Sequence, residues 1–215
     1  MNQTVFEPFD RVNATAAYLA GPNMDTDQII PGRFLKKDRA QTDPQGRRVG
    51  YSPYLFFDAR FDEQGRERAA HPLNAQDKPK ILLVDDNFGC GSSREGAVYA
   101  LADYGIRAVI STSFGDIFFN NCFKNGVLAI RLPAADHQTL RHAFAEPQSL
   151  TIDLPAQSIV FQGTELPFEV DDFSKACLMQ GVDELALTLS HADDITRFEH
   201  AYWQRFPWLA AGRQA

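Results

Sequence analysis

The pattern of hydrophobic and polar positions is most regular between residues 80 and 144. Three continuous apolar runs bounded by polar residues are typical of strands buried on both faces: KILLV (80–84), RAVIST (107–112) and VLAIRL (127–132). Segments with helical spacing separate and follow them, and the first two end at a glycine: REGAVYALADYG (94–105), FGDIFFNNCFKNG (114–126) and AADHQTLRHAF (134–144). This order predicts an α/β fold with a parallel or mixed sheet flanked by helices.

The N-terminal part of the chain has weaker patterns. Residues 1–20 are expected to be strand-rich, and residues 21–37 to form a loop with a short apolar piece. Residues 38–79 are the least regular part. Their aromatic stretch YSPYLFFDARF (51–61) is interpreted as a helix or turn that plugs the core, although a long insertion can also be a lid or an interface.

The C-terminal part changes from strand-like to helical character. Short β-like runs separated by turn residues predict antiparallel hairpins: SLTIDL (149–154), SIVFQG (158–163) and LPFEV (166–170). The pair Asp171-Asp172 is interpreted as a solvated turn, and SKACLMQG as a short helix that ends in Gly181. An acidic amphipathic, mostly helical segment follows. We expect a single domain over residues 1–205 and a loose tail over residues 206–215.

Composition narrows the class of protein. The net charge of −7 disfavours nucleic acid as a partner, because an acidic surface repels phosphate backbones. The three cysteines are far apart and have no CxxC spacing, so neither a disulfide framework nor a metal site built by this chain is expected. Reduced thiols fit a cytoplasmic protein. We also expect no secretory signal and no membrane-spanning segment.

The stretch NFGCGSSRE (87–95) stands at the carboxyl end of the first central strand, where open α/β sheets bind ligands. Gly89 and Gly91 let a ligand approach the main chain. The next helix is predicted to start near Ser93, and its free N–H groups would form an anion site. Arg94 adds a fork of donors that matches a carboxylate.

A structural explanation of the same residues has about equal weight when the stretch is taken alone. Ser92-Ser93-Arg94-Glu95 fits the capping box S-x-x-E. Capping, however, needs one hydroxyl and neither the two glycines nor the arginine, which favours a functional role. The stretch is not a Walker A loop, a G-x-G-x-x-G fingerprint or a G-x-S-x-G elbow. A carboxylate ligand is therefore favoured over a nucleotide.

Three motifs together resemble the small subunits of 3-isopropylmalate dehydratase, a family of the aconitase superfamily: NMDTDQIIPGRFL (23–35), NFGCGSSRE (87–95) and SFGDIFFNNCFKNGVLAI (113–130). The motifs occur in matching order and at matching distances, over roughly residues 1–205. The resemblance implies the swivelling β/β/α domain of aconitases, with a mixed sheet flanked by helices and short β-hairpins.

The resemblance also implies a reaction and a partner. The reaction is the interconversion of 2-isopropylmalate and 3-isopropylmalate in leucine biosynthesis, through dehydration to 2-isopropylmaleate and rehydration. The partner is a large subunit that carries a [4Fe-4S] cluster, so that this chain binds no metal itself and is active only in the complex. Such a hydro-lyase needs a base for the proton, a cationic site for the carboxylate of a hydroxy diacid and a Lewis acid for the hydroxide.

The implied roles fall on residues of the glycine-rich stretch. By resemblance, Ser92 is the base and acts as an alkoxide, which the helix N-terminus and Arg94 would make tenable. Arg94 would also clamp a substrate carboxylate, and Ser93 would hydrogen-bond it. Gly89 and Gly91 shape the loop, with Gly91 next to the substrate. Cys90 belongs to the same loop, and we interpret its side chain as a small buried thiol.

The first motif is expected to discriminate between substrates, because in the family the loop after DTD approaches the part of the substrate that differs between relatives. Ile29 and Ile30 suit an isopropyl group, although plain core packing is nearly as good an explanation. Arg33 could face a carboxylate or the partner subunit. The loop is expected to be braced by its own side chains: Asp25, Thr26 and Asp27. The third motif is interpreted as helix packing and positioning.

One residue departs from the family pattern. The family usually continues SSRE with histidine, whereas this chain has Gly96. Glycine early in a helix costs about 1 kcal/mol relative to alanine. The departure keeps open a related dehydratase of the citraconate or methylmalate type. A non-catalytic, carboxylate-binding assembly module is the rival from another class of protein.

Overall fold

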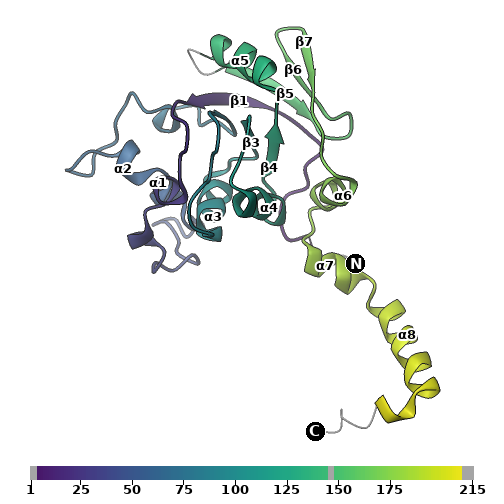
Figure 1. The fold of residues 1–215 in the computed structure, drawn as a ribbon. Helices are drawn as coiled ribbons and strands as arrows, with labels where there is room; N and C mark the ends of the chain where they lie inside the picture. Colours follow the sequence, from purple (N-terminus) through teal and green to yellow (C-terminus); the bar gives the residue numbers. More distant parts are fainter. Residues whose placement is uncertain (1–3, 145–147, 210–215) are drawn as a thin grey trace.

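The computed structural model describes residues 4–144 and 148–209, and it shows one mixed sheet with helices on both faces (Figure 1). The sheet has seven strands in the order β4-β3-β2-β1-β5-β6-β7. The strands are β1 (Arg11–Leu19), β2 (Ile81–Val84), β3 (Ala108–Ser111), β4 (Leu128–Arg131), β5 (Gln148–Asp153), β6 (Ser158–Phe161) and β7 (Thr164–Pro167). Neighbouring strands from β1 to β4 are parallel, whereas β5 joins β1 antiparallel and continues into β6 and β7. The predicted mixed sheet with hairpins is confirmed.

Helices connect the parallel strands and cover the sheet. Every residue of β2 and β3 is buried, as expected for parallel strands packed between helices. Figure 1 shows α3 and α4 on one side of the sheet and α5 on the other. The α-helices are α1 (Thr26–Ile29), α2 (Phe57–Arg60), α3 (Glu95–Tyr104), α4 (Asp116–Lys124), α5 (Ala134–Ala143), α6 (Asp172–Gln180), α7 (Glu184–Ser190) and α8 (Ala192–Arg205). Short 3-10 turns are η1 (Gly32–Phe34), η2 (Ser52–Tyr54), η3 (Pro72–Asn74) and η4 (Pro207–Leu209).

Two C-terminal boundaries differ from the prediction. The last hairpin strand is Thr164–Pro167 rather than 166–170, because Gln162 and Gly163 form a tight turn with positive φ that places Thr164 opposite Phe161. Asp171 does not lie in a solvated turn: its side chain accepts a hydrogen bond from the Ser174 N–H at 2.9 Å and caps α6. In the expected tail, residues 207–209 form η4, and residues 210–215 lie outside the described residues.

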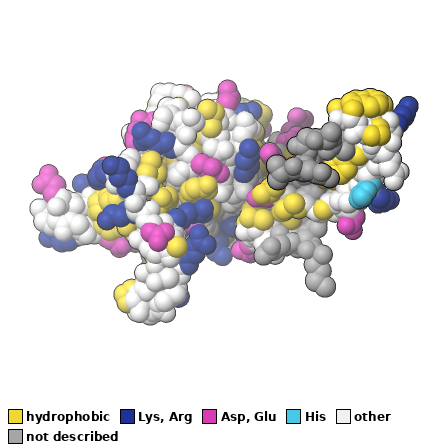
Figure 2. All heavy atoms as spheres, turned by 90° about the horizontal axis from the view of Figure 1, so that it is seen from below, with side chains coloured by type: hydrophobic (Ala, Val, Ile, Leu, Met, Phe, Trp, Pro, Cys, Tyr) yellow, Lys and Arg dark blue, Asp and Glu magenta, His cyan; other side chains and the backbone are white. Residues whose placement is uncertain are grey.

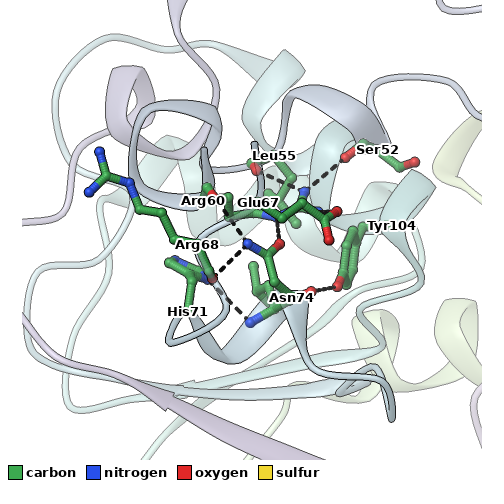
Figure 3. A network of polar contacts seen from close by, with 9 residues as sticks. Ser52, Leu55, Arg60, Glu67, Arg68, His71, Asn74 and Tyr104 are labelled. Carbon is green, nitrogen blue, oxygen red and sulfur yellow. Dashed lines mark hydrogen bonds and ion pairs between the residues drawn. The ribbon is translucent and has the colours of Figure 1, made fainter. Parts of the chain in front are cut away.

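Residues 38–79 form an ordered plug rather than an open loop, which confirms the interpretation of the aromatic stretch. Leu55 and Phe56 are almost fully buried. Arg60, only 5% exposed, donates to Asn74 Oδ1 at 2.8 Å and to the Leu55 carbonyl at 3.1 Å (Figure 3). Its guanidinium also lies over the ring of Tyr104 in α3, with 5.1 Å between Cζ and the ring centroid. These contacts attach the insertion to α3.

The C-terminal arm, residues 183–209, leaves the body after α6 and carries α8 well away from the sheet (Figure 1). Figure 2 shows hydrophobic side chains gathered at the end of the molecule that this arm forms. The large hydrophobic side chains of the arm that are exposed are Leu185, Leu189, Ile195, Phe198, Tyr202, Trp208 and Leu209. No helix in the described ranges is long and apolar enough to cross a membrane.

The loop that follows β2 is pressed against α4 by aromatic rings. Phe88 is fully buried, and its ring lies edge-on to that of Phe118, with 5.3 Å between centroids. Gly89 has φ +69°, and a Cβ atom at this position would lie 2.2 Å from Cγ of Phe118. A side chain at residue 89 therefore collides with the ring that anchors the loop.

We expect Gly89→Ala to lower the free energy of unfolding by about 2–4 kcal/mol, because the left-handed backbone and the collision with Phe118 both oppose a side chain. Gly163→Ala is the matched control, since Gly163 has φ +81° and no atom within 4 Å of an added Cβ. Gly163→Ala should lower the free energy of unfolding by less, because only the left-handed backbone opposes its side chain. Urea unfolding measures both, and equal losses in the two variants would contradict the close packing at Gly89.

The insertion should also make stability depend on pH. Burial, and then the charge of Arg60, lower the pKa of His71 to about 4. The unfolded chain therefore binds a proton near the ordinary histidine pKa of 6.5, whereas the folded chain does not until about pH 4. His71 thus contributes stability above pH 6.5 that is lost as the pH falls toward 4. His71→Asn can still cap η3, as the His71 ring does for the Leu73 N–H at 3.2 Å, but cannot titrate. Its urea midpoint should fall less than that of the native chain between pH 7 and 4.5, and parallel curves would refute the assignment.

Candidate active site

The loop after β1 and the loop after β2 are joined by backbone hydrogen bonds. The Asn23 N–H donates to the Asp86 carbonyl at 2.9 Å, and the Gly89 N–H donates to the Met24 carbonyl at 2.8 Å. The Thr26 N–H donates to the Cys90 carbonyl at 3.1 Å. The first two predicted motifs, which are about sixty residues apart in the chain, therefore lie side by side at the carboxyl ends of parallel strands.

The third motif joins this pair from the other side. The Phe88 N–H donates to the Ser113 carbonyl at 3.2 Å, and the Gly115 N–H returns a bond to the Phe88 carbonyl at 2.9 Å. A Cβ atom at Gly115 would lie 2.6 Å from the carbonyl oxygen of Gly89, so the two backbones touch. All three motifs consequently meet at one edge of the sheet.

A cleft of about 280 Å³ opens where the three loops meet. Six of the residues singled out in the sequence line it: Thr26, Gly89, Cys90, Gly91, Ser92 and Arg94. The other five lining residues belong to the third motif, which the sequence analysis interpreted as helix packing: Gly115, Asp116, Ile117, Phe118 and Asn121. The signal available in the sequence was the polar residues inside the third motif, Asp116 and Asn121. Ile117, the second residue of α4, gave no such signal, although it is 53% exposed in the structure.

Ser92 and Ser93 are exposed and lie ahead of the helix rather than on its first turn. Ser92 lines the cleft, whereas Ser93 is not among the lining residues. The helix α3 begins at Glu95 with Arg94 as its N-cap and no side-chain capping bond. The predicted start near Ser93 and the alternative capping box are therefore wrong. The Ser92 carbonyl accepts two hydrogen bonds, from the Arg94 N–H at 2.8 Å and from the Thr26 hydroxyl at 3.0 Å. These bonds turn the chain at Ser92, so the helix starts only after the turn.

Arg94 directly follows the two serines in the chain, and its side chain is bound to a carboxylate of the same chain. Its Nη1 contacts Oδ1 of Asp27 in a hydrogen-bonded ion pair. The Arg94 side chain is 33% exposed and that of Asp27 is 55% exposed. The same Asp27 oxygen accepts the Gly32 N–H at 3.2 Å. The guanidinium therefore lies in a place where a carboxylate binds it, within reach of solvent.

The remaining residues of the paired loops hold the backbone. Asp25 caps α1 in a reciprocal box with Gln28, with bonds of 2.8 and 2.9 Å. Thr26 is 2% exposed. Gly91 has φ +89°, which favours glycine. Cys90 is half-buried, so its interpretation as a buried thiol is wrong: the loop turns at Gly91 and leaves the side chain at the wall of the cleft.

The structure does not place the hydrophobic and basic residues of the first motif in the cleft. Ile29 and Ile30 are fully buried, so their aliphatic character serves the core and they cannot touch a bound molecule directly. Arg33 forms a two-pronged ion pair with Asp58 of α2 and lies over the ring of Phe34, with 4.6 Å from Cζ to the centroid. This hydrogen bonding lowers the pKa of Asp58. Arg33 is thus engaged within the chain.

The described residues offer no cluster that would hold a metal ion: no group of three or more histidine, cysteine, aspartate or glutamate side chains is suitably placed. The cysteines are all free, and burial raises the pKa of the Cys122 thiol. A [4Fe-4S] cluster needs three or four cysteine ligands around one point, so the residues of this chain do not fit it.

Comparisons with known proteins agree with the motifs. The family model of the aconitase C-terminal domain matches residues 7–135, and that of the C-terminal domain of the 3-isopropylmalate dehydratase small subunit matches residues 186–212. Proteins named 3-isopropylmalate dehydratase small subunit are similar over nearly their whole length. The protein from Saccharophagus degradans is 42% identical over 96% of this chain and 99% of its own. That from Pelagibacter ubique is 40% identical over 94% of this chain and 97% of its own.

The fold is also that of a solved relative. A crystal structure of 3-isopropylmalate dehydratase (LeuD) from Methanocaldococcus jannaschii superposes with a TM-score of 0.61 over 87% of this chain and 99% of that chain, at 24% sequence identity. The expected aconitase-type α/β domain, a mixed sheet flanked by helices, is confirmed. With two matching family models and relatives above 40% identity over nearly full length, the chain belongs to the family of 3-isopropylmalate dehydratase small subunits, in the aconitase superfamily.

Proposed function

We propose that this chain is the small subunit of a hydro-lyase that interconverts 2-isopropylmalate and 3-isopropylmalate through dehydration and rehydration. The relatives that share its full length bear this name. The observation that carries the proposal is that Ser92 and Arg94 line one cleft, built by the three motifs that identify the family. A hydroxyl and a guanidinium at one cleft are suited to a hydroxy diacid.

Arg94 is the group that holds a substrate carboxylate. Its planar fork binds a carboxylate with two parallel hydrogen bonds, and it already binds the carboxylate of Asp27. An ion pair as exposed as this one contributes only about 0–1 kcal/mol, so a substrate carboxylate can replace or share Asp27. The exposed Ser93 hydroxyl adds a neutral donor, and Gly91 keeps the approach to the main chain open.

Ser92 is the base that takes the proton from the carbon next to the carboxylate. Its hydroxyl is a very weak acid, so the alkoxide needs positive charge close by. Arg94 supplies that charge two residues away, and the first turn of α3 adds free N–H groups. The Ser92 carbonyl, held by Thr26 and Arg94, orients the serine toward the cleft.

The reaction also expels hydroxide, which is a poor leaving group and requires a Lewis acid. The described part of this chain holds no group of side chains that would bind one. We infer that the Lewis acid is a [4Fe-4S] cluster on an iron–sulfur large subunit, which covers the cleft in the active complex. The names of the relatives, as small subunits, support such a partner. The free cysteines support a reducing compartment, the cytoplasm, as the location.

The proposal predicts that activity appears only in the complex and depends on Ser92. The ultraviolet absorbance of the conjugated enoic acid formed from 3-isopropylmalate should rise anaerobically when the chain is mixed with its large subunit, and not with either alone. Ser92→Ala should lower kcat about 100-fold or more, because loss of a general base costs 10²–10⁴-fold. Ser149→Ala, at an exposed position of β5, is the matched control and should keep full activity. If the complex with Ser92→Ala turns over 3-isopropylmalate at the native rate, Ser92 is not the base. The chain would then be a non-catalytic module for carboxylate binding and assembly.

A further inference from the structure

The space beside Gly96, where a side chain would lie, is occupied by the side chain of Leu35. Gly96 is the second residue of α3, and a Cβ atom built there would lie 2.4 Å from Cδ2 of Leu35. Methyl carbons approach each other to about 3.5–4.0 Å, so the two groups cannot both be accommodated. The next two atoms, Cγ of Leu35 and Cε2 of Tyr51, are both 3.9 Å away, which is an ordinary contact distance. Leu35 thus fills the position that a side chain at residue 96 would take.

Leu35 is held on both sides of this contact. It ends η1, and its N–H donates to the Gly32 carbonyl at 3.2 Å. Its own carbonyl accepts the hydroxyl of Tyr51 at 3.2 Å. Tyr51 is buried, and its N–H donates to Oδ2 of Asp103 in α3 at 2.8 Å. Leu35 therefore joins the short loop over residues 32–35 to the body of α3.

The other end of the same loop touches the proposed carboxylate-binding arginine. A Cβ atom at Gly32 would lie 3.2 Å from Nη1 of Arg94 and 3.2 Å from Oδ1 of Asp27. The loop accordingly meets the start of α3 at two points, Gly32 against Arg94 and Leu35 against Gly96. Two points of contact determine how the loop is rotated, and hence where its backbone lies relative to the guanidinium.

We propose that Gly96 and Leu35 act as a coupled pair of positioning residues that set the loop over residues 32–35 against Arg94, and through it the binding of substrate. The proposal rests on the proposed function of Arg94 as the carboxylate-binding group. Neither residue touches the reacting atoms. A methyl group at residue 96 displaces Leu35, the loop rotates, and Gly32 moves relative to Arg94 and Asp27. The atoms nearest to the added methyl group belong to the side chains of Leu35 and Tyr51 and not to the backbone, so the chain still folds.

The test is a double-mutant cycle in the assembled complex, with 3-isopropylmalate as substrate. Gly96→Ala should raise KM about tenfold and change kcat less than about twofold, because misplacement of a binding group by about 1 Å can cost 10²-fold. In the Leu35→Ala background, where the space is free, Gly96→Ala should change KM less than about twofold. Lys36→Ala, at the exposed neighbour of Leu35, is the matched control and should keep the native KM. An unchanged KM in Gly96→Ala would contradict the proposed coupling of Gly96 and Leu35. An equal rise in KM in the native and Leu35→Ala backgrounds would contradict it as well.

Urea unfolding of the same four variants gives a readout that does not depend on activity. Alanine is a better helix former than glycine, so Gly96→Ala should raise the unfolding midpoint in the Leu35→Ala background and lower it in the native background. If Gly96→Ala raises the unfolding midpoint equally in the native and Leu35→Ala backgrounds, residue 96 and Leu35 do not compete for the same space. If the native complex fails to turn over 3-isopropylmalate, the proposed function fails instead, and the unfolding cycle still decides whether Leu35 and Gly96 are coupled.

Discussion

Backbone hydrogen bonds between the loop after β1 and the loop after β2 are the constraint on which the rest of the cleft depends. Three N–H groups, those of Asn23, Gly89 and Thr26, find their acceptors across this junction rather than within their own loops. Main-chain bonds of this kind do not depend on side-chain rotamers, so they fix the relative position of the two loops firmly. Without this junction Arg94 and Asp27 would not meet, since they are 67 residues apart in the chain.

The electrostatics of the cleft follow from the same junction. The protein is acidic overall, with a net charge of −7, yet Arg94 and the exposed Ser92 line the same cleft at a sheet edge. Asp27 partly neutralises that arginine in the free subunit, through an ion pair in which both side chains remain accessible to solvent. A dicarboxylic substrate brings its own negative charge and takes up the same donors.

The architecture could be predicted from the sequence because each central strand is a continuous apolar run and a glycine follows each of the first two connecting helices. β2, β3 and the end of their connecting helix α3 occur where the pattern placed them, and Gly105 ends α3 with φ +101°. The resemblance also brought together the three motifs that form the cleft. Burial could not be predicted equally well: Ile29 and Ile30 look the same in the sequence whether they face a ligand or the core.

The predictions that the structure did not confirm concern residues whose positions depend on contacts with distant parts of the chain. The start of α3 moved to Glu95 because the Ser92 carbonyl is taken by Thr26, a partner more than sixty residues away. The pairing of Arg33 with Asp58 joins η1 to α2, two short elements whose sequences carry no periodic signal. The contribution of Asp116 and Ile117 to the cleft was hidden because the third motif also fits an ordinary packed helix.

The most direct test of this account is the Michaelis constant of the assembled complex for 3-isopropylmalate when Arg94 is replaced by lysine. Lysine keeps the positive charge but loses the planar fork, so we expect KM to rise about 10- to 100-fold, the equivalent of a charge-assisted hydrogen bond of about 1.5–3 kcal/mol. The chain should still fold, because Arg94 lies beside the open cleft and not in the core. A KM equal to that of the native complex would contradict Arg94 as the group that binds the substrate carboxylate.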